Sequence, residues 1–69
     1  MPRDTHNRAA EHHENAAKAH RVAAEHHSKG DHQSAHQHST KAHELSTKAH
    51  EHSTKAHKMS EDKLRSAAA

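Results

Sequence analysis

The sequence predicts an all-α protein, an antiparallel hairpin of two helices that pack along a heptad seam. Ala, Glu, Lys, Arg and Gln, which favour helices, dominate the chain, with one proline at position 2 and one glycine at position 30. Residue types also recur every seven positions, most plainly in STKAHELSTKAHEHSTKAHKM over residues 39–59. Sustained heptads are typical of helices that wrap on one another, and the interior glycine divides the chain into two such helices.

The first helix is predicted over about residues 5–28. Asp4 or Thr5 can cap its start, because a short polar side chain accepts a hydrogen bond from a free backbone N–H of the first turn. One heptad position of this helix is histidine and two are alanine. The rows are His6, His13, His20 and His27; Ala9, Ala16 and Ala23; and Ala10, Ala17 and Ala24.

The break between the helices is predicted at Lys29, Gly30 and Asp31. Gly30 suits a left-handed position that ends a helix, and Asp31 can cap the helix that follows. The second helix is then predicted over about residues 32–65, fraying into Ser66 and three alanines. A break this short makes the helices antiparallel neighbours, so we expect residues 1–69 to form a single helical hairpin.

The second helix repeats four rows. They are Ala35, Ala42, Ala49 and Ala56; His36, His43, His50 and His57; His38, Leu45, His52 and Met59; and Ser39, Ser46, Ser53 and Ser60. At 100° per residue the alanine row lies between the row of Leu45 and the serine row, and the row of His36 lies beyond the serines. The predicted seam is therefore made of small residues and imidazoles.

The chain has little with which to build a hydrophobic core. It has no aromatic residue and no cysteine, and its large aliphatic residues are Val22, Leu45 and Leu64, joined by two methionines. Leu45 and Met59 are expected in the seam. A small scaffold of this kind usually needs a metal or self-association to be stable. We expect a homodimer or higher homo-oligomer, with two hairpins forming a four-helix bundle.

Histidine rows beside a small-residue seam can reach across it. One antiparallel register pairs the two histidine rows with each other. These pairs are His27 with His36, His20 with His43, His13 with His50, and His6 with His57. Two heptad rows always generate such a set, so neighbouring registers, such as His20 with His38 or His6 with His52, remain open.

The histidines predict transition-metal binding. Neutral imidazole is a common ligand, and with no thiolate the candidate ions are zinc, copper(II), nickel and cobalt(II), of which we expect copper, zinc or nickel. Residues seven apart on a helix are separated by about 10.5 Å, so each row implies a ladder of sites completed by the facing helix or a second molecule. His32 and His36 form the one i,i+4 pair, whereas the doublets His12-His13 and His26-His27 should serve different faces. The predicted ligands are His6, His13, His20, His27, His32, His36, His43, His50 and His57.

The expected function is a metal buffer, store or tolerance protein. An alternative is a structural or interaction protein that responds to pH, because free imidazole titrates near ~6.5 and the chain has 13 histidines. A lower alternative is a haem-binding bundle, for which the chain lacks an apolar wall. The residues do not converge on a nucleophile and base, so we do not expect an enzyme.

Charge and hydropathy limit the partners and the location. The 11 basic and 9 acidic residues alternate and no aromatic residue is available for stacking, which argues against a nucleic-acid partner. The chain shows no signal-peptide core and no run of residues able to span a bilayer. We therefore expect a cytoplasmic protein with no membrane partner.

The stretch AAEHHENAAKAHRVAAEHHSKGDHQSAHQH, residues 9–38, resembles a group of small, uncharacterised bacterial proteins rich in Ala and His. These proteins show repeated A-A-x-H-H phrases, a G-D or G-N turn and further A-H repeats. The resemblance implies a helical hairpin with a metal-related role. This sequence has His27-Ser28 where the group often has an aromatic residue before the turn, a difference that favours dimerisation here.

Overall fold

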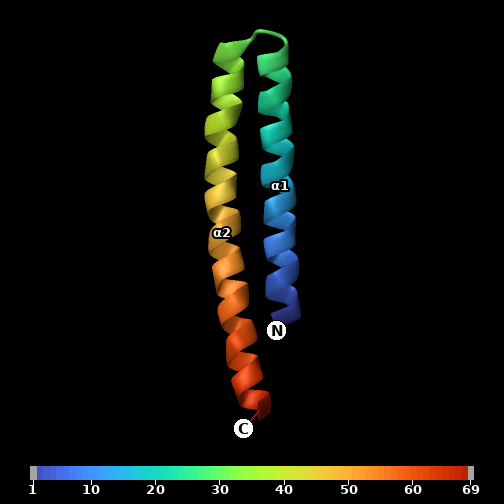
Figure 1. Cartoon of the computed structure of the whole chain (residues 1–69), viewed down its shortest axis with the longest axis vertical. Helices are drawn as coiled ribbons and strands as arrows, with labels where there is room; N and C mark the ends of the chain where they lie inside the picture. The colour runs from blue at the N-terminus through green and yellow to red at the C-terminus, as the bar shows by residue number, and fades with distance from the viewer. Residues whose placement is uncertain (1, 69) are drawn as a thin grey trace.

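The computed structural model describes residues 2–68 as two long antiparallel helices joined by a short turn (Figure 1). Helix α1 spans Pro2–Ser28 and helix α2 spans His32–Ala68. The described part is a rod 58 Å long and 13 × 12 Å across. The predicted all-α hairpin is confirmed for these residues. Positions 1 and 69 of the predicted domain lie outside them.

The helices begin and end slightly differently from the prediction. Helix α1 begins at Pro2, before the predicted caps Asp4 and Thr5, because proline has the fixed φ of a helix and its missing N–H is not needed in the first turn. Helix α2 continues to Ala68, since alanine is the best helix former. Its last turns extend past the start of α1 (Figure 1), and Leu64 in this overhang is 71% exposed.

The turn forms as the sequence predicts. Gly30 has φ of 79°, the left-handed conformation that costs a residue with a Cβ about 1–2 kcal/mol. Its N–H donates to the carbonyl of His27 at 3.0 Å, and the N–H of Asp31 donates to the carbonyl of His26 at 2.9 Å. The Asp31 side chain caps α2, because its Oδ1 accepts the backbone N–H of Ser34 at 3.2 Å.

The seam between the helices is built from alanine. Every fully buried hydrophobic side chain within residues 2–68 is an alanine: Ala9, Ala16 and Ala23 of α1, and Ala35, Ala42, Ala49 and Ala56 of α2. The four of α2 are 0% exposed. Alanine at the contact lets helix axes approach to about 8 Å. Larger seam residues, including Leu45 and Met59, are only partly buried beside these alanines, as predicted.

Three contacts across the seam show its register. The Thr5 hydroxyl donates to Met59 Sδ at 3.0 Å, and the rings of His12 and His52 and of His26 and His38 stack. From one contact to the next, the residue number in α1 rises by seven or fourteen and the residue number in α2 falls by the same amount. One register therefore holds over the whole hairpin. The same register places Ala19 opposite Leu45.

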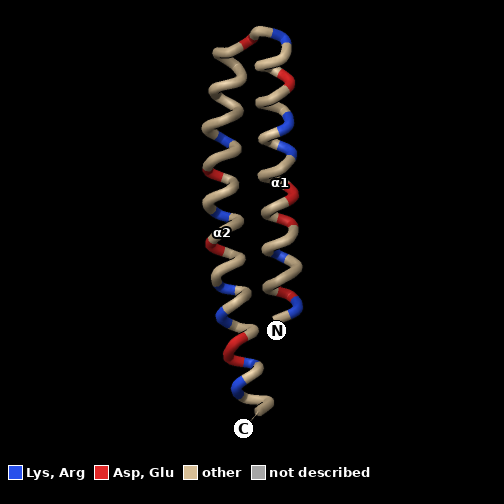
Figure 2. The backbone as a smooth tube through the Cα atoms, viewed as in Figure 1, with Lys and Arg blue, Asp and Glu red and all other residues tan. Residues whose placement is uncertain are grey.

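Charged residues lie mainly along the outer sides of the two helices (Figure 2). The surfaces of the two helices that face each other consist mainly of alanine, serine and histidine. No polar or charged side chain among the described residues is fully buried. Neither helix, over the described part of the chain, has an apolar stretch of the length needed to cross a membrane.

Candidate functional site

The two histidine doublets of α1 divide between different surroundings, as the sequence predicts. His12 and His26 turn into the seam, where each stacks on a histidine of α2. His13 and His27 lie at the edge of the seam and form hydrogen bonds there. A difference of one residue rotates a side chain by 100°, which accounts for the division.

The stacked pairs are not arranged to chelate an ion. The rings of His12 and His52 have centroids 4.0 Å apart and planes 9° apart, and those of His26 and His38 are 4.7 Å and 12° apart. An imidazole nitrogen binds a metal through a lone pair in the plane of its ring. Two nearly parallel planes this far apart cannot both contain one ion about 2.0 Å from each nitrogen. We assign the stacked pairs to packing.

The edge of the seam carries bonds from histidine to serine. Nε2 of His13 lies 2.6 Å from the Ser53 hydroxyl, and Nε2 of His20 lies 3.0 Å from the Ser46 hydroxyl. The register that would pair His13 with His50 and His20 with His43, one of those that the rows leave open, is therefore not the one adopted. The open alternative of His20 with His38 is also not formed, because His38 stacks on His26.

The remaining pairings of that set differ too. His27 turns to His32 and not to His36, and His57 lies 3.2 Å from Oε1 of Glu61 in its own helix. His52 stacks on His12, so the open alternative of His6 with His52 is not formed. The physical reason lies in the Cα–Cβ bonds, which tilt toward the N-terminus of each helix. In this antiparallel pair the side chains of α1 lean away from the turn and those of α2 lean toward it. A residue of α1 therefore meets a residue farther along α2 than the rows alone suggest.

The two outer histidine rows line one edge of the hairpin with serine between them. We call this surface the histidine edge; it comprises His6, His13, His20 and His27, the serines Ser39, Ser46 and Ser53, and His36, His43, His50 and His57. All eight histidines are exposed, and the serines are partly buried. His13 lies on Ser53, whose neighbours at i−3 and i+4 in α2 are His50 and His57. Imidazoles of both helices are thus neighbours along this edge.

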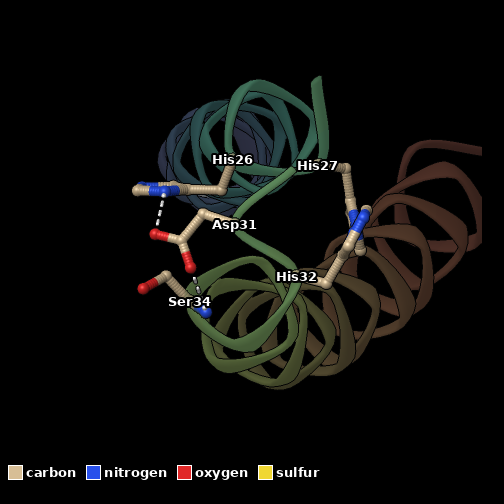
Figure 3. A network of polar contacts seen from close by, with 5 residues as sticks. All are labelled: His26, His27, Asp31, His32 and Ser34. Atoms are coloured by element: carbon tan, nitrogen blue, oxygen red, sulfur yellow. Dashed lines mark hydrogen bonds and ion pairs between the residues drawn. The ribbon is translucent and has the colours of Figure 1, made fainter. Parts of the chain in front are cut away.

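The turn brings a further pair together. Nδ1 of His27 and Nδ1 of His32 are 2.9 Å apart, with ring centroids 5.1 Å apart and planes at 39° (Figure 3). Both side chains are exposed. One nitrogen donates and the other accepts, so at least one of the two rings carries a lone pair at the contact.

An acidic side chain supports the opposite side of the turn. Oδ2 of Asp31 lies 3.5 Å from Nδ1 of His26, while Oδ1 caps α2 at Ser34 (Figure 3). The backbone N–H of Ser34 lowers the pKa of Asp31 below its usual value, and the Ser34 hydroxyl and His26 act in the same direction. Asp31 thus fixes the turn without approaching the pair of His27 and His32.

The predicted ligands are all placed on the histidine edge or at the turn. Within residues 2–68, no group of three or more His, Asp or Glu side chains is already arranged around one ion. The contact of His27 with His32 was not predicted from the sequence, which indicated the i,i+4 pair His32 and His36. The available signal was a histidine on each side of the Ser-Lys-Gly-Asp turn.

Comparisons with known proteins give no further guide. No protein-family model, curated protein or solved structure matches the chain. The resemblance to Ala/His-rich bacterial proteins stays a prediction.

Proposed function

We propose that the chain is a histidine-rich protein that binds divalent copper, zinc or nickel, and that it buffers, stores or detoxifies the ion. The observation that supports this function is the histidine edge, where eight exposed imidazoles from two helices lie beside uncharged serine hydroxyls. Neutral imidazole is a ligand for all three ions. No carboxylate or thiolate is required.

The spacing along the edge favours several weak sites over one closed site. Histidines in one row are about 10.5 Å apart, so an ion must take ligands from both rows. His13 is the natural partner of His50 or His57, because it already lies on the serine between them. An ion bound to His13 takes the place of the Ser53 hydroxyl as the partner of its Nε2. The remaining coordination positions of the ion are filled by water or by a second molecule.

A second copy of the chain fits this arrangement. The hydrophobic side chains that are fully buried in the described seam are all alanines, and each methyl group contributes about 0.8 kcal/mol when buried. A hairpin of this size with so small a core gains most from metal binding or association. We propose that two hairpins form a four-helix assembly in which metal ions link their histidine edges.

The function is tested by titrating the full chain, first freed of metal with a chelator, with zinc, copper(II) or nickel at pH 7.5. Calorimetry gives stoichiometry, far-ultraviolet circular dichroism gives helix content, and sedimentation velocity gives the assembly state. We expect saturable binding of at least one of these ions at a defined ratio, with a rise in sedimentation coefficient.

Matched variants separate the histidine edge from the seam. The triple variant His43→Gln, His50→Gln and His57→Gln should lower the stoichiometry, whereas His12→Gln with His52→Gln should leave it unchanged. Glutamine keeps the helix and the polarity of each position. Equal losses in the two variants, or no saturable binding by the wild-type chain, would contradict the proposal.

The same sample distinguishes the alternative of a pH-responsive structural protein. Helix content is followed from pH 8 to pH 5 in chelator. A helical assembly that dissociates below about pH 6, and that does not respond to metal at pH 7.5, would favour that alternative.

A further inference from the structure

We infer that His27 and His32 form a two-histidine chelate at the hairpin turn, and that this chelate binds the first copper(II) ion taken up by the chain. The inference rests on the proposed function and specifies one of its sites. It assigns the strongest site to the turn, away from the His–Ser contacts of the histidine edge.

The separation of the two ring nitrogens is that of two adjacent ligands on one ion. Nδ1 of His27 and Nδ1 of His32 are 2.9 Å apart. With metal–nitrogen bonds of about 2.0 Å, ligands at a right angle are separated by about 2.8 Å and ligands in a tetrahedron by about 3.3 Å. The observed separation matches the right angle of a square-planar or tetragonal ion. Copper(II) and nickel(II) prefer that geometry, and copper(II) binds nitrogen ligands more tightly.

Metal binding needs only a small chemical change at the pair. In the metal-free contact one Nδ1 carries the proton that the other accepts. For the ion to bind both Nδ1 atoms, that proton leaves Nδ1 for solvent and the same ring takes one from solvent at Nε2. The imidazole stays neutral. With bonds of about 2.0 Å the ion lies about 1.4 Å to one side of the line that joins the two Nδ1 atoms, so each ring turns to aim its lone pair at the ion.

The backbone holds the two histidines in place without help from the metal. The turn is closed by the bond from Gly30 N–H to the carbonyl of His27 and by the bond from Asp31 N–H to the carbonyl of His26. Asp31 also caps α2 and meets His26 on the far side of the turn (Figure 3). A preformed pair loses less conformational freedom on binding than two histidines that must first approach each other.

The other histidines of the described residues do not offer the same arrangement. His12 stacks on His52 and His26 stacks on His38, in nearly parallel planes. His13 and His20 each meet a serine hydroxyl. His36 follows His32 by one helical turn, so it is positioned to become a third ligand after a rotation of its side chain.

The inference is tested by nuclear magnetic resonance on the full chain in the chelated and washed form. Copper(II) sulfate is added below one equivalent at pH 7.5, and its paramagnetism broadens the signals of nearby nuclei. We expect the ring and amide signals of His27 and His32 to broaden first. The signals of His43 and His50, exposed histidines farther along α2, should keep their intensity until later additions.

Affinity measurements with matched variants complete the test. His27→Ala and His32→Ala should each weaken the first copper(II) equivalent by about tenfold or more, because each leaves a single ligand where two acted together. The double variant should be no weaker than either single one. The control, His43→Ala with His50→Ala, should leave the first equivalent unchanged. All these positions are exposed, and circular dichroism in chelator checks that each variant keeps its helices.

Two results would overturn the inference, and they differ in meaning. If the wild-type chain binds copper(II) saturably but the His27 and His32 variants keep the first equivalent, the site is assigned wrongly while the proposed function stands. If the wild-type chain shows no saturable binding, the proposed function fails and the site fails with it.

Discussion

Replacing Ala49 by leucine should separate the two helices. Ala49 is 0% exposed and lies in the middle of α2, between the stacked ring of His52 and the partly buried Leu45. Leucine adds three carbons where the alanine seam leaves no room, and such overpacking costs about 1–3 kcal/mol. If the helices move apart, each lost histidine–serine bond adds about 0.5–1.5 kcal/mol. Part of this loss is offset by burial of the new side chain.

The change is measured by thermal unfolding in chelator, followed by circular dichroism at 222 nm. A loss of 2 kcal/mol lowers Tm by about 8–16 °C in a chain of this size. The control is Ala24→Leu, the same substitution at an exposed position of α1, for which we expect a change within about 0.5 kcal/mol. If Ala49→Leu is as stable as the wild-type chain, or more stable, the close alanine seam is not the contact that holds the hairpin.

Three further predictions concern the turn and the register. The pKa of Asp31 is lowered in the folded state, so its cap stabilises the fold at pH values above the pKa of the unfolded-state carboxyl, ~4. This stabilisation is lost as the pH falls through the lower pKa of the folded state. Asp31→Asn should therefore remove the part of the change in Tm between pH 5 and 2 that comes from this cap. Gly30→Ala should cost about 1–2 kcal/mol from backbone strain alone, because nothing lies within 4 Å of the added Cβ, and Gly30→Asn should cost less in the same thermal melt. The stacked ring of His52 should shift the ring protons of His12 upfield, and His52→Ala should return them to ordinary positions in a proton spectrum. An unchanged melt for the turn variants, or an unchanged His12 spectrum, would count against the corresponding contact.

The fold could be predicted because it depends on local signals. Gly30 and Asp31 mark the turn by their backbone and capping preferences, and the alanine rows mark the seam by their seven-residue spacing. The division of the doublets also follows from helix geometry, since His12 and His13 must point in different directions. These features need no knowledge of how the helices meet.

The register could not be read from the rows. A heptad pattern is compatible with several pairings, and the one adopted depends on the path of the turn and on the tilt of side chains toward each helix N-terminus. As a result His20 meets Ser46 where the rows alone suggest His43. The contact of His27 with His32 depends on the same turn geometry, so it emerged only from the structure.

The most direct test of metal binding by imidazole is X-ray absorption at the copper K-edge on the full chain loaded with one equivalent of copper(II). We predict a first shell of nitrogen or oxygen at about 2.0 Å with the outer-shell scattering of at least two imidazole rings. A shell without imidazole scattering, as for an ion held by water and carboxylate oxygens, would contradict it.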